Sequence, residues 1–248
     1  MNKTTIYKLT NQDLCTYNNT QWALGEPKTT SGQGELCGAG FLHAYTDPTL
    51  ALIMNPIHAN FKNPRLFRGE GNLIKEDGGL KIGCDWMVLL EELDLPVITT
   101  EQRVRFAIMS ALEVHRNEKF VGWVKSWLSG QDRSASSAQA AWSAAKAVWS
   151  AARAVCAVEE AARSAAWAVE AAALAARAAE YAVEAAAWSA TRPVVWVVEE
   201  AEEEAARVAA WAAEAAAEAA GAPGGIVDSK GASKNRLDFI SIIKEAGL

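Results

Sequence analysis

A seven-residue repeat runs through the alanine-rich part of this chain and limits what that part can fold into. From Trp142 onward the sequence divides into the blocks WSAAKAV, WSAARAV, CAVEEAA, RSAAWAV, EAAALAA, RAAEYAV and EAAAWSA. The third and seventh positions of each block carry alanine or valine, and they alternate by four and three residues, which is the a/d spacing of a coiled coil. Alanine also has the highest intrinsic helix propensity. The repeat therefore predicts long helices that pack on other helices through small side chains.

The length of the repeat predicts self-association. We expect one helix from about Ser136 to Thr191, and at ~1.5 Å per residue it would reach roughly 80 Å, too long to bury its own packing face. A strict seven-residue period predicts a left-handed supercoil. Pro193 predicts a kink or a tight break, and the sequence leaves open whether the chain reverses there. Beyond it the repeat resumes one residue out of phase. We predict a homo-oligomer with these contact residues: Ala144, Val148, Ala151, Val155, Val158, Ala165, Val169, Ala172, Ala179, Val183, Val194, Val198, Ala201, Ala205 and Val208.

Charge and cysteine spacing exclude several classes of protein. Residues 1–130 carry 13 Lys and Arg against 14 Asp and Glu, while residues 131–220 carry 7 against 13, so the net charge of −6 lies mainly on the alanine-rich part. This balance offers no basic surface for general nucleic-acid binding. No stretch of about 18 apolar residues is free of charge, so we expect no membrane span. The four cysteines lie far apart, as is typical of reduced thiols in a cytoplasmic protein: Cys15, Cys37, Cys84 and Cys156.

The fold class that we predict is α+β, a small mixed domain followed by long alanine-rich helices. Short β-rich runs are expected at Thr5–Thr10, Leu66–Arg68, Leu80–Cys84 and Trp86–Leu90. A helix that begins at Pro48 should run to about Met54, and Pro56 and Pro64 should then keep the chain extended.

Helix-capping signals mark two further helices and the domain boundaries. Thr99 with Gln102 predicts a capping box, and Asn117 and Gly130 predict the ends of the next helix. We divide the chain into residues 1–130, an α+β domain with two closing helices; 131–192, the first alanine-rich helix; 193–221, a second one; and 222–248, a linker with an amphipathic helix from Ser233. That last helix should bury Leu237, Ile240 and Ile243.

The segment from Cys37 to Asp47 holds the residues with the most chemistry. A glycine-bracketed approach to a strand that bears His43 and Tyr45 fits a nucleotide pocket, with His43 as a base or a hydrogen-bond donor. The alternative is a tight turn before a strand whose histidine is only hydrogen-bonded. The candidate ligand-binding residues are Cys37, Gly40, Asp47 and His58. No spacing supports a metal site, and no cofactor is expected. For His115, the end of a helix should favour the charged form.

A series of motifs in residues 5–130 carries a resemblance to a known family. The motifs are Cys37-x-x-Gly40-Phe41-Leu42-His43-Ala44, Asp47-Pro48, Asn55-Pro56-Ile57-His58, Arg68-Gly69-Glu70-Gly71 and Lys81-Ile82-Gly83-Cys84. In this order they resemble uncharacterised phage and prophage proteins that join a Cys-x-x-Gly-aromatic-His domain to a variable alanine-rich tail. The resemblance implies a phage origin and a place in the host cytoplasm. A looser similarity links Gly40–Ala51 to the strand–helix junction of ADP-ribosyltransferases.

Three functions are compatible with these patterns. The leading hypothesis is a non-enzymatic, homo-oligomeric interaction or assembly protein, in which the helices set the copy number and the front domain binds a host or phage protein. The second is a nucleotide-handling, ADP-ribosyltransferase-like enzyme that uses a pocket around His43. The third is a virion or scaffold component, which would form filaments or large rings.

Overall fold

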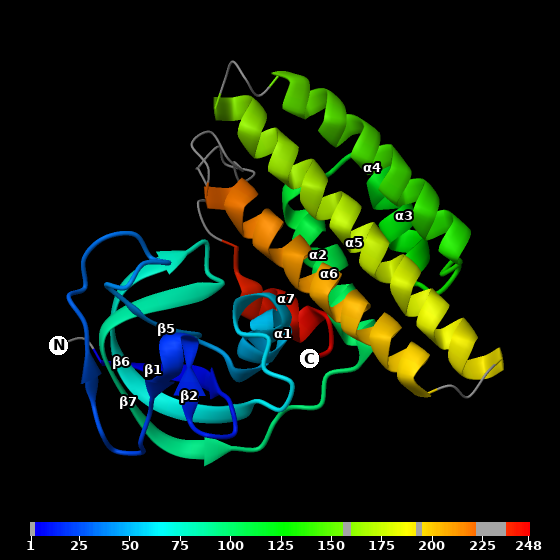
Figure 1. The fold of residues 1–248 in the computed structure, drawn as a ribbon. Coiled ribbons are helices and arrows are strands. Elements are labelled where there is room, and N and C mark those ends of the chain that lie inside the picture. The colour runs from blue at the N-terminus through cyan, green and yellow to red at the C-terminus, as the bar shows by residue number, and fades with distance from the viewer. Residues whose placement is uncertain (1–2, 156–159, 192–194, 222–236) are drawn as a thin grey trace. The chain divides into compact units, whose positions relative to one another are not determined.

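The structure is a computed structural model that describes residues 3–155, 160–191, 195–221 and 237–248. The chain divides into two compact units, Met1–Val97 and Ile98–Leu248. Strands dominate the first unit and helices make up the second (Figure 1), so the prediction of a mixed sheet with helices is confirmed. Within the described ranges, no helix is both long enough and apolar enough to cross a membrane.

The first unit is built on one antiparallel sheet with the strand order β1–β6–β7–β4, and β5 also pairs with β7. The strands are β1 (Lys3–Thr10), β4 (Lys28–Thr29), β5 (Leu42–Ala44), β6 (Arg65–Asp77) and β7 (Lys81–Leu93). The three short runs predicted after residue 60 are therefore parts of two 13-residue strands joined by a tight turn.

Glycines and bulges let the long β6–β7 hairpin curl. The pairing register shifts between Arg68 and Gly69, and twice more between Asn72 and Lys75. A side chain at Gly69 would collide with the carbonyl oxygen of Val88, so only glycine fits where the strands bend this closely. The curl brings β1 against the residue that follows β5, where Tyr7 and Tyr45 exchange backbone hydrogen bonds of 2.8 and 2.9 Å.

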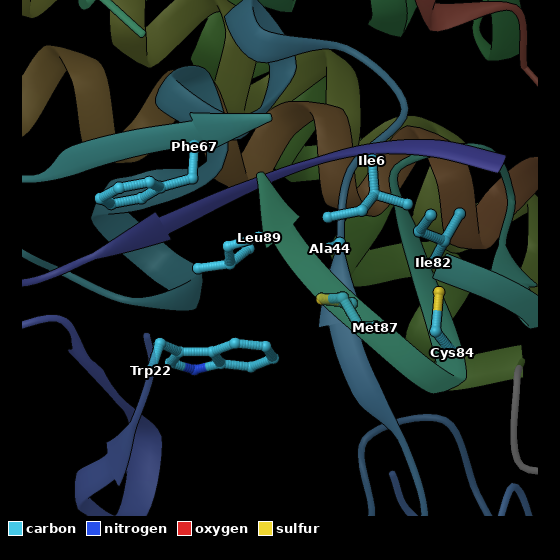
Figure 2. Close-up of a cluster of buried hydrophobic side chains, with 8 residues drawn as sticks. All are labelled: Ile6, Trp22, Ala44, Phe67, Ile82, Cys84, Met87 and Leu89. Carbon is cyan, nitrogen blue, oxygen red and sulfur yellow. The ribbon is translucent and has the colours of Figure 1, made fainter. Parts of the chain in front are cut away.

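The curled sheet encloses the core of the first unit. Eight buried side chains meet there, and Trp22 lies across one end of the cluster (Figure 2). They are Ile6, Trp22, Ala44, Phe67, Ile82, Cys84, Met87 and Leu89. Trp22 follows a small hairpin formed by β2 (Cys15–Thr16), the 3-10 turn Tyr17–Asn19 and β3 (Thr20–Gln21). Its indole nitrogen donates to Thr16 Oγ1 over 3.0 Å, which joins the hairpin to the core.

The helix α1 (Pro48–His58) begins as predicted and ends later than predicted. Asp47 caps it by accepting hydrogen bonds from the backbone N–H groups of Thr49 and Leu50. Pro56, which we expected to lie in an extended segment, is inside the helix. It falls in the last turn of α1. A proline there removes one backbone N–H donor, and little of the helix lies beyond it. The backbone N–H of Asn60 then closes the end on the carbonyl of Asn55.

The second unit begins earlier than residue 130. Its first helices, α2 (Thr100–Val114) and α3 (Glu118–Leu128), belong to it rather than to the strand-rich unit, so the predicted boundary was wrong. Their caps are as predicted: Thr99 and Gln102 form a complete capping box, and Asn117 caps α3. Helix α2 is amphipathic and its buried face contacts α5 and α6, which is why it groups with the helices that follow.

The alanine-rich part forms three helices where one long helix and a kinked extension were expected. They are α4 (Ala135–Val155), α5 (Glu160–Thr191) and α6 (Val195–Gly221). Consecutive helices pack along one another, α4 with α5 and α5 with α6, so the chain reverses direction twice (Figure 1). The kink or tight break expected at Pro193 lies outside the described residues. Because neighbouring segments of one chain pack together, a second copy is not needed to bury the packing face.

The predicted contact residues fall into three groups. Val169, Ala172, Ala179, Ala205 and Val208 are buried within the chain, and Val183 and Ala201 are half-buried. Ala144 is exposed while its neighbour Ala145 is buried, so at this point of α4 the prediction is wrong by one residue. The placement or the side chains of the others lie outside the described residues: Val148, Ala151, Val155, Val158, Ala165, Val194 and Val198.

Helix α7 (Phe239–Glu245) ends the chain and packs on α2. It starts later than the predicted Ser233, because Asp238 caps it by accepting from the backbone N–H of Ser241. Phe239 contacts Phe106 of α2 with 5.8 Å between ring centroids. Leu237 and Ile243 are buried as predicted, while Ile240 is half-buried.

Candidate functional site

His43 lies on the outer face of the curled sheet. It pairs with Gly83 of β7, whose neighbours Ile82 and Cys84 point into the core, so the alternation of a strand directs His43 outward. Its Nε2–H donates to the carbonyl oxygen of Leu36, and its Nδ1 has no hydrogen bond to any described residue. The bond to a carbonyl fixes the proton on Nε2 and leaves Nδ1 as an acceptor.

The surroundings of His43 keep its imidazole neutral. Partial burial lowers its pKa below the ordinary value of 6.5, and the nearby ammonium groups of Lys81 and Lys8 lower it further. The Leu36 carbonyl and the Asp77 carboxylate act in the opposite direction and are outweighed. A neutral histidine with a free ring nitrogen can accept a proton near pH 7.

Asp77 and Lys81, at the two ends of the β6–β7 turn, are functional candidates that the sequence did not reveal. The Asp77 carboxylate accepts from the backbone N–H of Lys81 and lies 3.5 Å from its ammonium group. Burial raises the pKa of Asp77, and the Lys81 contacts only partly offset this. The Lys81 side chain is 12% exposed and also donates to Cys37 Sγ over 3.4 Å. The turn thus joins two charged groups to an exposed thiol.

Tyr45 and His58 form a second pair beside this group. The Tyr45 hydroxyl lies 2.7 Å from His58 Nδ1, and the two rings stack with 6.0 Å between centroids. This contact joins the segment after β5 to the last turn of α1. His58 also acts on the pKa of Asp77, which it lowers through its charge. His43, Cys37, Tyr45 and His58 are therefore gathered in one region, together with Asp77 and Lys81.

Two predicted ligand-binding residues have structural roles. The side-chain oxygen of Asp47 is occupied by the capping of α1. Gly40 lies so close to the Gln33 carbonyl oxygen that any side chain there would collide with it. These positions shape the loop and the helix that frame His43 and do not offer groups to a ligand.

The same region does not resemble a metal centre, and His115 lies in the other unit. The described residues contain no group of three or more His, Cys, Asp or Glu side chains placed to hold a metal ion. Among the described cysteines, Cys15, Cys37 and Cys84 are free thiols, and burial raises the pKa of Cys84 to about 11. Burial also lowers the pKa of His115, which caps the end of α2 and packs edge-on against Phe120.

We define the outer cluster as His43, Asp77 and Lys81, with Cys37, Tyr45 and His58 around them. It combines a neutral imidazole, a carboxylate, an ammonium group and a thiol, the groups that general acid–base and nucleophilic chemistry use. Strand β5 supplies His43, and the β6–β7 hairpin supplies both Asp77 and Lys81. Comparison of the chain with protein-family models, with curated proteins and with solved structures finds no match to any of them.

Proposed function

We propose that the first unit is a nucleotide-handling enzyme, a transferase or hydrolase, and that the outer cluster is its active site. The observation that carries this proposal is that the Asp77–Lys81 ion pair of the β6–β7 turn acts on the pKa of His43, whose Nδ1 has no hydrogen bond to any described residue. Burial shifts the pKa values of His43 and Asp77, and perturbed pKa values gather at functional sites. In this reading His43 removes a proton from the attacking group and Lys81 binds a phosphate oxygen.

This order of hypotheses differs from the one that the repeat favours. A single long helix would need a second copy to bury its apolar face. Val169, Ala172 and Val208 are instead buried by helices of the same chain, so their burial does not require a second copy. The outer cluster, in contrast, has a composition that packing alone does not require.

The test is turnover by the purified full-length chain. It would be incubated with NAD⁺ and with nucleoside mono-, di- and triphosphates, and the products followed by mass spectrometry. We expect one of these compounds to be consumed by the wild type and His43→Ala to lower the rate by about 100-fold or more, as is usual for a general base. His115→Ala is the matched control, because His115 is also a half-buried histidine with a lowered pKa. No turnover of any compound, or equal turnover in His43→Ala, contradicts the proposal.

A second candidate function, homo-oligomeric assembly, is supported by Trp211. This side chain is 41% exposed in the middle of α6, one turn beyond Arg207. An exposed tryptophan between charged residues is typical of a contact point for a protein partner. The supercoil that the seven-residue period predicts, and the virion or scaffold role, belong to this candidate.

Native mass spectrometry distinguishes the two candidates. A discrete multiple of the 26.6 kDa chain that returns to the monomer in Trp211→Glu supports assembly. Species of open-ended mass support a scaffold role. A monomer at all concentrations contradicts the assembly role and the scaffold role, and it does not bear on the enzyme proposal.

A further inference from the structure

Two lysines point into the interior of the curled sheet. Lys8 of β1 lies on the same strand face as the core residue Ile6, and Lys28 of β4 pairs with the core residue Met87. Both ammonium groups lie over the ring of Trp22, Lys8 at 4.9 Å and Lys28 at 5.7 Å from the centroid. The interior end of the sheet that Trp22 covers therefore carries two positive charges.

The charge of Lys8 is only partly compensated. Lys8 is 8% exposed, and its ammonium group donates to the carbonyl oxygen of His43 over 2.6 Å. Among the described residues, no carboxylate lies within ion-pair distance of either Lys8 or Lys28. An indole face and one carbonyl offset part of the cost of burying an ammonium group, and two of its three N–H donors have no partner in the described chain.

The electrostatics agree with this geometry. Burial lowers the pKa of Lys8 from 10.5 to about 8, and the thiol of Cys84 is the only group that acts against this. The titratable groups near Lys8 are Cys84 from β7, Lys28 from β4 and His43 from β5. The backbone carbonyl of His43 also accepts from the ammonium group of Lys8. A bound anion would supply the compensation that the chain itself lacks.

We propose that Lys8, Lys28 and Trp22 form a binding site for a small oxyanion, a phosphate or a carboxylate, at the interior end of the curled sheet. Two ammonium groups beside the same indole ring suit the oxygens of such a group, and their hydrogen bonds to it would be charge-assisted. Lys28 is half-buried and so connects the buried charge with solvent. The site uses the face of the sheet opposite to the outer cluster, and it does not depend on the proposed enzymatic activity.

The site can be tested by titrating the ¹⁵N-labelled full-length chain at pH 7 with inorganic phosphate and, separately, with acetate. The indole N–H resonance of Trp22, assigned with Trp22→Phe, is the readout, and sodium chloride at equal ionic strength is the reference. We expect a saturable shift with at least one anion, and the anion that produces it gives the ligand class. The pKa of Lys8, followed by side-chain NMR, should rise in its presence.

Three variants decide the outcome. Lys28→Met should weaken the apparent affinity about tenfold, the loss of one charge-assisted contact, and Lys8→Met should abolish the saturable shift. Lys62→Met, which removes an exposed lysine, should leave it unchanged. Lys28→Met keeps the test valid if Lys8→Met does not fold, because β4 is a two-residue edge strand. Shifts no larger than those with chloride, or equal affinities in wild type and Lys28→Met, overturn the proposal.

Discussion

The guanidinium carbon of Arg177 lies 5.2 Å from the centre of the Trp142 ring, and this contact joins α5 to α4. Both residues occupy the first position of their seven-residue blocks, 35 positions apart in the sequence. Arg177 also pairs with the buried Glu180 and donates to the Tyr181 hydroxyl over 2.9 Å. One side chain thus links the two helices and compensates a buried carboxylate.

Removing the Arg177 guanidinium group should destabilise the second unit, and neutralising Glu180 should recover part of the lost stability. Arg177→Met keeps the packing of the aliphatic stem and leaves Glu180 buried without its partner, so the free energy of unfolding should fall by about 2 kcal/mol. Adding Glu180→Gln should restore about half of the loss. Urea unfolding followed by circular dichroism measures both. If the double variant is no more stable than Arg177→Met, the buried charge is not the cause.

Enlarging a buried alanine should overpack the helices. Ala172 is fully buried, and Ala172→Leu should lower the free energy of unfolding by roughly 1–3 kcal/mol because the neighbouring helices cannot move apart without losing contacts. Ala144→Leu is the matched control, since Ala144 is exposed and leucine has a similar helix propensity. Thermal unfolding at two protein concentrations provides the measurement. A loss in Ala144→Leu as large as that in Ala172→Leu would contradict the overpacking argument.

The bend of the β6–β7 hairpin should depend on Gly69. In Gly69→Ala the new methyl group would meet the Val88 carbonyl oxygen, and we expect a loss of more than about 2 kcal/mol in the stability of the first unit. Gly122 of α3 has open space around it, so Gly122→Ala should instead raise the stability of the second unit by up to about 1 kcal/mol. Hydrogen exchange of buried amides in each unit separates the two effects. Normal protection of β7 in Gly69→Ala would refute the steric argument.

The stability of the first unit should depend on pH through Lys8 and Cys84, with opposite signs. Folded Lys8 loses its proton near pH 8 and unfolded Lys8 near 10.5, so the unfolded chain binds more protons between these values and stability rises with pH. Folded Cys84 keeps its proton to about pH 11 and unfolded Cys84 to about 9, so its contribution falls over that range. We therefore expect a rise between pH 8 and 9 and little net change from these two groups between 9 and 10.5.

Lys8→Met isolates the first of these contributions. The shift of Lys8 corresponds to up to about 3 kcal/mol between its folded and unfolded pKa values. The difference in unfolding free energy between wild type and Lys8→Met should therefore change with pH from 8 upward and be constant below. Denaturation followed through the Trp22 indole resonance gives this difference. A difference that does not vary with pH would mean that Lys8 has the same pKa in the folded and the unfolded chain, and that burial does not lower it.

Features that depend on neighbouring residues could be predicted from the sequence. The Thr99–Gln102 capping box, the Asn117 cap and the Asp47 cap follow from side chains within three residues of the backbone groups that they bind. The buried positions of α6, such as Ala205 and Val208, follow from the period of the repeat. Each of these features depends on residues that are close together in the sequence, so the sequence alone is enough to predict it.

Features that depend on distant pairing could not be predicted in the same way. The residues between Val155 and Glu160 include no glycine or proline, and they continue the repeat, so the end of α4 has no signal in the sequence. Asp77 and Lys81 join the outer cluster through the register of the β6–β7 hairpin, in which they face one another. The resemblance to a phage family stays a prediction.

The antiparallel packing of α4 and α5 has a consequence for how the gene can change. One seven-residue block lengthens a helix by ~10 Å, so a block gained in only one of two neighbouring helices would extend beyond its partner and leave small apolar side chains in water. Gains or losses of 21 nucleotides should therefore be tolerated in pairs, one on each side of the reversal after Val155. Descendants of this chain would then differ by even numbers of repeat blocks, with the strand-rich unit unchanged.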